Sequence, residues 1–352
     1  MYFASDNAGP AHPKVMQAVL DANEGYAGSY GADDIMERVR NRLREIFEAP
    51  DAVVYLVATG TAANALALGC YTQPWQTIFC TKVSHINEDE CNAPEFYAGG
   101  AKLTLVPGGD KMQPTALREA IAYEEARGVH GPQRGPVSIT QVTERGGVHD
   151  LEHLRSLGAV AGEFGLPVHM DGARFANALV ALGCSPAEMT WKAGVDVLSF
   201  GGTKNGCLGV EAVSFFDPSK AWEFELRRKR GAHLFSKHRY LSAQMAAYLE
   251  ENLWLDLAKR ANDTAARLAK GLTAQGAKLL HPLEANMVFA ALPRQVHQHL
   301  MDESAMYYLW GATLKGDDPN ELLPARFVCD WSIAPHLVDQ FLGVLQSTTA
   351  SA

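Results

Sequence analysis

Two short segments carry residue types with which this chain could do chemistry. Residues 168–174 read Val-His-Met-Asp-Gly-Ala-Arg, an apolar run that ends in Asp171. Residues 199–205 read Ser-Phe-Gly-Gly-Thr-Lys-Asn, a second apolar run that ends in a glycine-rich turn bearing Lys204. In an α/β protein such runs are buried strands, and ligands bind at the carboxyl edge of the sheet that they form. The pattern therefore predicts a carboxylate and an amine together at that edge.

A carboxylate and an amine in this arrangement suit pyridoxal phosphate. The ring nitrogen of this cofactor must stay protonated if the ring is to accept electrons, and an aspartate such as Asp171 ensures that it does. The aldehyde must be held as a Schiff base, which the amine of Lys204 can form. Lys82 is a rival amine. Its turn lacks the glycines that allow close approach before Lys204, so Lys204 is favoured.

A phosphate site is predicted where the strand-like run at residues 53–57 leads into Ala-Thr-Gly-Thr-Ala-Ala-Asn at residues 58–64. Gly60 lets an anion approach the backbone, Thr61 adds a hydroxyl, and the start of the following helix supplies free N–H groups. The segment has neither the GxxxxGK[ST] nor the GxGxxG pattern of nucleotide-binding loops, so a smaller phosphate is expected. The alternative is a plain helix cap.

His85 and Arg174 are further candidates for this edge. His85 follows the next predicted strand, at residues 77–80, where its flat imidazole could stack on a pyridine ring. The alternative is an ordinary core or surface histidine. Arg174 follows Asp171 by one short turn and could keep Asp171 ionised or reach a substrate; the alternative is a surface ion pair.

The elements that would position these residues alternate between strands and helices. The chain has 352 residues, which fits one large domain and a smaller one. Apolar runs predict strands at 53–57, 77–80, 103–106, 137–142, 167–170, 195–200 and 212–216. Helical patterns lie between several of them, for example at 115–125, 150–164 and 175–182. This alternation predicts an α/β fold with a mostly parallel sheet and helices on both faces.

The remaining third of the chain reads differently. Residues 241–272 form a long helical region that suits a connector, and strands are expected near 285–290 and 324–329 before a final helix at 334–345. We therefore expect a large cofactor-binding domain with an N-terminal arm at residues 1–245. A small α+β domain is expected at residues 246–352.

Composition argues against several classes of protein. The formal net charge is −9, and the densest basic run, residues 227–230, lies beside acids. That run is expected to be a solvated helix face or a subunit contact, not a nucleic-acid surface.

The six cysteines contain no CxxC pair, which favours reduced thiols. No metal site is expected. No signal peptide or membrane span is visible. We expect a cytoplasmic protein whose partner is a small molecule.

Taken together, the motifs resemble a known family. The resemblance rests on Ser-Asp-Asn at residues 5–7, Tyr-Gly at 30–31, Thr-Gly-Thr at 59–61, His85, His-Met-Asp-Gly-Ala-Arg at 169–174 and Asn-Met-Val-Phe at 286–289. The chain is similar to the low-specificity L-threonine aldolases, which are pyridoxal phosphate lyases of the aspartate-aminotransferase fold (fold type I). The similarity runs over nearly the whole chain, and the Asp-Gly-Ala-Arg element is its most specific part.

The resemblance implies a role for each candidate. It assigns phosphate binding to Gly60 and Thr61, ring stacking to His85, the ring nitrogen to Asp171, the ring's phenolic oxygen to Arg174, the Schiff base to Lys204, and substrate binding to Ser5, Tyr30 and Arg326. Ser5 and Arg326 would grip the substrate carboxylate, and Tyr30 would come from, or reach toward, a neighbouring subunit. Family members also carry an arginine in a glycine-rich loop that reaches the partner subunit's phosphate. Residues 231–239 stand at that place, and Lys237 is the expected counterpart. A homotetramer, a dimer of dimers, is implied.

The resemblance also implies an activity. It predicts retro-aldol cleavage of L-threonine, L-allo-threonine and related β-hydroxy-α-amino acids to glycine and an aldehyde. The general base is either His85 or a water that it holds. Alternatives are a phenylserine-preferring aldolase and another fold type I lyase or aminotransferase, which would use the same Asp171 and Lys204. A further alternative is a catalytically silent binding module, which retention of these residues disfavours.

Overall fold

The structure is a computed structural model that describes residues 1–349 of the chain. Its strands are β1 (Val53–Val57), β2 (Gln76–Thr81), β3 (Lys102–Val106), β4 (Gln133–Thr140), β5 (Val168–Gly172), β6 (Val197–Gly201), β7 (Glu211–Phe215), β8 (Lys278–Leu279), β9 (Met287–Pro293), β10 (Tyr308–Leu309) and β11 (Leu322–Val328). Its α-helices are α1 (Pro13–Asp21), α2 (Asp34–Ile46), α3 (Gly60–Tyr71), α4 (His85–Glu88), α5 (Ala93–Tyr97), α6 (Pro114–Ala126), α7 (Leu151–Glu163), α8 (Phe175–Leu182), α9 (Ala221–Arg230), α10 (Arg239–Leu249), α11 (Leu253–Ala274), α12 (Arg294–Asp302) and α13 (Pro335–Thr349).

A seven-stranded sheet organises the first two thirds of the chain. Its order is β1-β7-β6-β5-β4-β2-β3. The pairs β2–β3, β2–β4, β4–β5 and β5–β6 are parallel, and β7 runs antiparallel to both of its neighbours. Because β7 reverses direction on each side, β1 runs the same way as β6. The carboxyl ends of β1, β2, β5 and β6 therefore lie at one edge, and the expected mostly parallel α/β sheet is confirmed.

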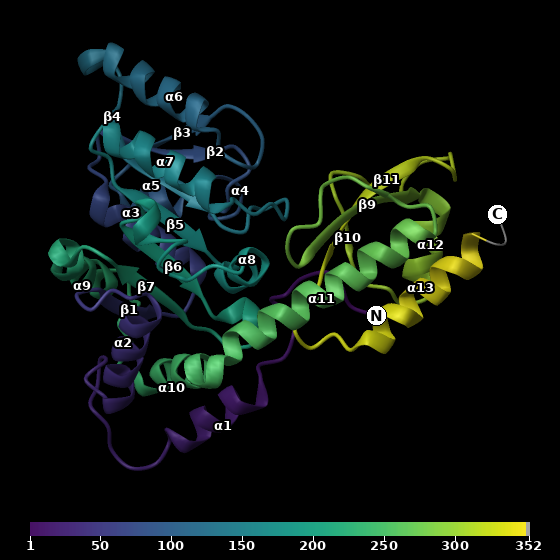
Figure 1. Ribbon diagram of the computed structural model, residues 1–352, viewed down its shortest axis with the longest axis horizontal. Coiled ribbons are helices and arrows are strands. Elements are labelled where there is room, and N and C mark those ends of the chain that lie inside the picture. Colours follow the sequence, from purple (N-terminus) through teal and green to yellow (C-terminus); the bar gives the residue numbers. More distant parts are fainter. Residues whose placement is uncertain (350–352) are drawn as a thin grey trace.

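Helices cover both faces of this sheet (Figure 1). Successive residues of β1 point to opposite faces, as in any strand. Val54 and Leu56 join a core with α2, α6, α7, α8 and α10, whereas Tyr55 and Val57 join a second core with α3 and α9. Burial on both sides explains why these strands read as continuous apolar runs. None of the helices within residues 1–349 is both long and apolar enough to cross a membrane.

The expected continuous helix over residues 241–272 is wrong. α10 ends at Leu249 and α11 begins at Leu253, and between them Glu251 and Asn252 adopt φ angles of 50° and 58°. These left-handed conformations interrupt the helical hydrogen bonds. The apolar pattern continues on both sides of the break, so periodicity alone does not reveal it. α11 then runs from the seven-stranded sheet to a second, smaller sheet (Figure 1).

The second sheet has four antiparallel strands in the order β10-β11-β9-β8. α11, α12 and α13 pack against it and enclose a separate apolar core. This is the small α+β unit that the sequence predicts. A domain boundary at residues 245/246 stays a prediction; it would fall within α10.

The N-terminal arm is fastened to this smaller sheet. Phe3 donates its N–H to the carbonyl of Met306 at 2.7 Å, and its own carbonyl accepts from Val328 at 2.8 Å. Its ring is fully buried and packs edge-on against Phe327 and Phe341. In Figure 1 the arm leaves the four-stranded sheet and crosses the molecule to α1 beside α10. The arm thus links the two sheets.

Removing the Phe3 ring should therefore loosen the arm. Phe3→Ala is expected to lower the free energy of unfolding by ~3 kcal/mol or more, because large-to-small changes in a core lose burial and leave a cavity. Tyr2→Ala is the matched control, since Tyr2 is 40% exposed. Urea denaturation of both variants measures the difference, and equal stability of the two would contradict the anchoring role of Phe3.

Candidate active site

Asp171 and Lys204 lie at the same edge of the seven-stranded sheet. Asp171 is near the carboxyl end of β5, and Lys204 lies in a short 3-10 helix, η3 (Thr203–Asn205), directly after β6. β5 and β6 are parallel neighbours with Asp171 opposite Ser199. The two apolar runs therefore end at the same edge of the sheet, where Asp171 and Lys204 both lie, as the sequence predicts.

The glycines before Lys204 let its turn pack tightly against the neighbouring chain. A Cβ atom on Gly201 would lie 2.3 Å from the carbonyl oxygen of Ala173, and one on Gly202 would lie 2.6 Å from that of Val210. Any other residue would push the turn away from the sheet. Within the described residues, Lys204 makes no hydrogen bond or ion pair, so its amine is available for chemistry.

The start of α3 lies at the same edge and is suited to an anion. Thr59 caps the helix by accepting from Ala62 N–H at 3.2 Å. The N–H groups of Gly60 and Thr61 precede the first intrahelical bonds and are open to an anion. A Cβ on Gly60 would meet nothing within 4 Å, so there is open space in front of the helix end.

A buried hydrogen-bond network connects α3, β5 and the segment after β2. The side-chain amide of Asn64 donates to Asp171 Oδ2 at 3.0 Å and to Glu90 Oε1 at 2.8 Å. The same Glu90 oxygen lies 2.7 Å from His85 Nδ1. Asp171 also accepts from the backbone N–H of Ala173 at 3.1 Å. His85 and Asp171 are thus held in fixed relation through two residues for which the sequence predicts no role.

Glu90 raises the pKa of His85 and orients its ring. Burial alone would lower the pKa of His85, but the hydrogen bond to Glu90 and the negative charges of Asp171 and Glu90 outweigh it, so the pKa lies above its usual value. Burial likewise raises the pKa of Glu90, against the hydrogen bond from His85. The imidazole is therefore oriented by a carboxylate on one ring nitrogen, which leaves Nε2 for another partner.

Arg174 is buried and its hydrogen-bond partner is the arm, not Asp171. Its Nε and Nη2 donate to the two oxygens of Asp6 at 2.7 and 2.9 Å. Asn286 adds a third hydrogen bond to Asp6 at 3.2 Å. The expected alternative of a surface ion pair is wrong, since Arg174 is only 7% exposed. It fails because the arm, which is distant in sequence, inserts the carboxylate of Asp6 between the sheets.

Asp6 is held ionised by this arrangement. Burial alone would raise its pKa, but the charges of Arg174 and Lys204 and the hydrogen bonds from Arg174 and Asn286 bring the pKa below its usual value. The neighbouring Ser5 accepts from Asn7 N–H at 3.1 Å through its hydroxyl. Its predicted contact with a substrate carboxylate stays a prediction.

Arg326 reaches this region from β11 of the smaller sheet. Its guanidinium lies 4.9 Å from the ring of Trp310 and 5.9 Å from that of Tyr308. Its Nε atom is buried without a hydrogen-bond partner. Burial and the nearby charge of Arg174 lower the pKa of Arg326. An unpaired buried donor beside a second cation favours an anionic ligand there.

Tyr30 and Lys237 lie on two neighbouring loops. Tyr30 donates its N–H to the carbonyl of Ser236 at 3.2 Å, and both Tyr30 and Lys237 are exposed. Among the described residues, neither forms a hydrogen bond or ion pair with Asp171 or Lys204. Their predicted roles, which involve a neighbouring subunit, stay predictions.

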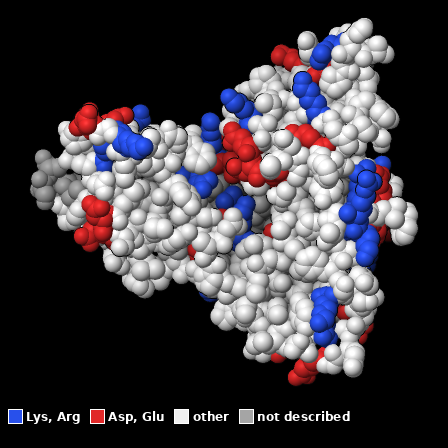
Figure 2. Space-filling model, turned by 180° about the vertical axis from the view of Figure 1, so that it is seen from behind, with Lys and Arg blue, Asp and Glu red and all other residues white. Residues whose placement is uncertain are grey.

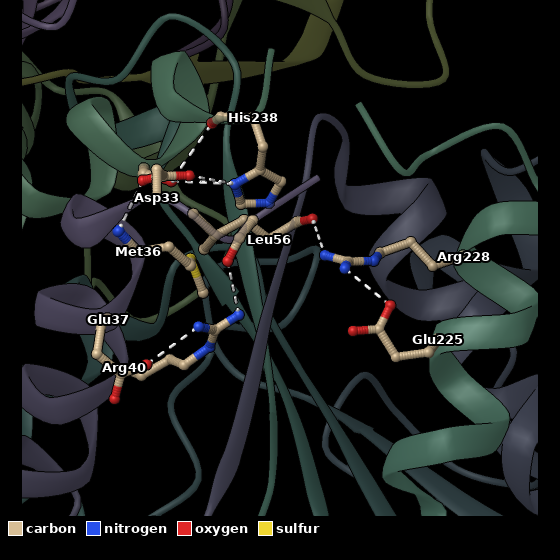
Figure 3. Close-up of polar contacts among 10 residues, drawn as sticks. Asp33, Met36, Glu37, Arg40, Leu56, Glu225, Arg228 and His238 are labelled. Atoms are coloured by element: carbon tan, nitrogen blue, oxygen red, sulfur yellow. Dashed lines mark hydrogen bonds and ion pairs between the residues drawn. The ribbon is translucent and has the colours of Figure 1, made fainter. Parts of the chain in front are cut away.

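A buried polar cluster anchors these two loops (Figure 3). Asp33 caps α2 through Met36 N–H at 2.8 Å, and its carboxylate lies 3.7 Å from His238 Nδ1. Burial and the charge of Arg228 lower the pKa of His238 to about 4, so at neutral pH the ring is uncharged. Arg228 donates to Leu56 O at 3.2 Å, at the free edge of β1. Arg228 is only 1% exposed, so it does not belong to the solvated helix face or subunit contact expected for residues 227–230, whereas Lys229 and Arg230 are exposed.

The surface is hollowed between the part that carries the four-stranded sheet and the rest of the molecule (Figure 2). Acidic and basic side chains gather in this hollow. This fits a site assembled from both sheets, in which groups of opposite charge face a common space.

Comparison with known proteins identifies the family. Residues 2–294 match the model of the family described as "Beta-eliminating lyase". A low specificity L-threonine aldolase from Pseudomonas sp. is 40% identical over 94% of this chain and 92% of its own length. A threonine aldolase structure from Leishmania major has a TM-score of 0.92 at 25% identity and covers 99% of both chains.

A more distant structure shows the breadth of the fold. A serine palmitoyltransferase variant from S. paucimobilis with bound PLP has a TM-score of 0.70 at 18% identity, over 100% of this chain and 87% of its own. At that identity the likeness concerns the fold alone, which is the aspartate-aminotransferase-like fold type I. The match to the family model and the 40% identity over most of both chains go further, and the chain belongs to the beta-eliminating lyase family, among the low specificity L-threonine aldolases.

Proposed function

We propose that this chain is a pyridoxal phosphate-dependent aldolase. It cleaves L-threonine, L-allo-threonine and related β-hydroxy-α-amino acids to glycine and an aldehyde. The observation that carries the proposal is the meeting of two sets of groups from different sheets. The open start of α3, Asp171 and Lys204 belong to one sheet, and the buried, unpaired Nε of Arg326 belongs to the other.

The residues present fit the cofactor. The free N–H groups of Gly60 and Thr61 would hold its phosphate, because a helix start attracts anions and the space in front of Gly60 is open. Asp171 would keep the ring nitrogen protonated, and Lys204 would bind the aldehyde. When bound, pyridoxal phosphate supplies an electron-withdrawing ring that stabilises the charge left when a bond to Cα breaks.

The protein's own residues then bind and orient the substrate. The guanidinium fork of Arg326 matches the substrate carboxylate and fixes the configuration at Cα. His85, or a water that it holds, takes the proton of the β-hydroxyl group as the Cα–Cβ bond breaks. Glu90 orients the ring for this task and stabilises its protonated form. A proton then returns to Cα in place of the broken bond, so the products are an aldehyde and glycine.

We also propose the subunit contacts, the role of Arg174 and the location of the protein. Tyr30 and Lys237 are exposed and lie on loops anchored by the buried cluster of Figure 3. In a homotetramer, Tyr30 would bind substrate across a subunit contact, and Lys237 would reach the cofactor phosphate of a neighbouring subunit. Lysine would act there as a point charge. Arg174 would approach the ring's phenolic oxygen with the one nitrogen that Asp6 leaves free. The six free cysteines suit a cytoplasmic protein of amino-acid metabolism.

Product analysis distinguishes this activity from other reactions on the same cofactor. L-Threonine should yield glycine and acetaldehyde in equal amounts, and L-allo-threonine and L-phenylserine should be cleaved as well. No residue described here selects strongly at the β-substituent, so low selectivity is expected. D-Threonine should be inert. Formation of a 2-oxo acid without an aldehyde would contradict the proposal and indicate elimination or transamination.

The carboxylate site predicts a specific kinetic change. Arg326→Lys keeps the charge but loses the two-pronged geometry of the guanidinium. KM should rise by roughly tenfold for every substrate alike, since one charge-assisted hydrogen bond contributes about 1.5–3 kcal/mol. Steady-state kinetics with L-threonine and L-allo-threonine measure this. A change confined to one of the two diastereomers would place Arg326 at the β-substituent instead.

The Glu90–His85 pair predicts a shift in pH dependence. Glu90 raises the pKa of His85, so Glu90→Gln should lower it. His85 must be neutral to act as a base, and the acid limb of the kcat/KM profile should therefore move to lower pH. Glu88→Gln, an exposed change at the end of α4, two residues before Glu90, is the control. If the limb stays in place in Glu90→Gln, His85 is not the group that titrates there.

A further inference from the structure

We propose that Glu211 is a positioning residue that fixes the turn bearing Lys204. The inference rests on the proposed function, in which Lys204 binds the cofactor aldehyde. Glu211 is the first residue of β7 and lies opposite Gly201 in the sheet. It is only 6% exposed. Neither its position nor its type marks it in the sequence as part of the site.

Glu211 holds the two residues that immediately precede Lys204. Its Oε2 accepts from the backbone N–H of Gly202 at 2.7 Å. The hydroxyl of Thr203 donates to the same carboxylate and accepts from the N–H of Val210, at 3.1 Å. The direction in which the Lys204 side chain leaves the turn is therefore set by one carboxylate.

The rest of the turn is held by other groups. Tyr248 donates its hydroxyl proton to Gly201 O at 3.2 Å, and Asn205 donates to Tyr248 and to Trp254 O at 2.7 and 2.8 Å. These bonds fix the residues on either side. Among the described residues, none other than Glu211 accepts from the N–H of Gly202. Losing this acceptor would leave a buried donor unpaired and release the middle of the turn.

A carboxylate at this position is costly for the fold and therefore calls for a role. β7 is buried on both faces, where an apolar residue would suit the core. Burial raises the pKa of Glu211 to about 7, against the hydrogen bonds from Thr203 and Gly202 and the charge of Lys204. The other titratable groups that act on it or feel its charge are Asp171, Cys207 and Tyr248. None of the three donates a hydrogen bond to it.

The test compares Glu211→Ala and Glu211→Gln with a control, Glu124→Ala. Glu124 is also 6% exposed and accepts from side chains, but it lies in α6, away from Lys204. Two quantities are measured. One is kcat and KM of the holoenzyme with L-threonine. The other is the rate at which reductive methylation labels Lys204 in the cofactor-free protein, mapped by mass spectrometry.

Positioning predicts a distinct pattern. In Glu211→Ala, kcat should fall by roughly 100-fold with KM nearly unchanged, because a misplacement of about 1 Å has such an effect on a reacting group. The labelling rate of Lys204 should rise as the turn loosens. Glu211→Gln should restore most of the kcat, since its amide oxygen can accept from Gly202. Glu124→Ala should match the wild type in both measurements.

Three results would overturn the proposal. One is a Glu211→Ala enzyme with the kcat and labelling rate of the control. Another is a Glu211→Gln enzyme as impaired as Glu211→Ala, which would show that charge and not position matters. If Glu211→Ala does not fold, Thr203→Val removes the hydroxyl link instead, and an unchanged kcat and labelling rate would be the third. Failure of the proposed function is separate: the wild type would release no aldehyde, while the labelling comparison would still report on the turn.

Discussion

The buried ion pair between Asp6 and Arg174 is the interaction on which the arrangement of the site depends. Taking two charges out of water is unfavourable unless both are paired, and removing one partner of such a pair typically costs ~3–5 kcal/mol. Both oxygens of Asp6 are used by Arg174, and Asn286, just before β9, donates to one of them. One carboxylate thereby joins the arm, the seven-stranded sheet and the chain entering the four-stranded sheet. The ion pair matters more for fixing the relative positions of the arm and the two sheets than for the free energy of unfolding.

The relative positions of the site residues depend on this ion pair. The arm is anchored in the smaller core by Phe3 and bonded near the Lys204 turn, where His12 N–H donates to Gly206 O at 2.8 Å. With both ends fixed, Arg326 is brought to the edge where Lys204 lies. At this edge, positive charges lower the pKa of Asp6 and negative charges raise the pKa of His85. The proposed reaction needs this balance, because each reacting group must be in a particular protonation state.

Local sequence predicts much of this structure, but not its long-range pairs. Strands buried on both faces are visible as apolar runs, and the glycines before Lys204 mark a close approach, so Asp171 and Lys204 could be placed from sequence. The bond between Asp6 and Arg174 spans 168 positions, and no local pattern encodes it. Glu90 and Asn64 act through side chains that meet only after folding. The helix break at Glu251 is set by backbone angles that the apolar pattern does not reveal.

Lys204 is the residue proposed to carry the cofactor. Borohydride reduction of the purified holoenzyme, followed by proteolysis and mass spectrometry, tests this assignment most directly, because reduction makes the lysine–cofactor bond permanent. The pyridoxyl group should be found on the peptide containing Lys204 and should be absent from the Lys204→Ala variant. A pyridoxyl group on Lys82, or a protein that traps no cofactor at all, would contradict the account.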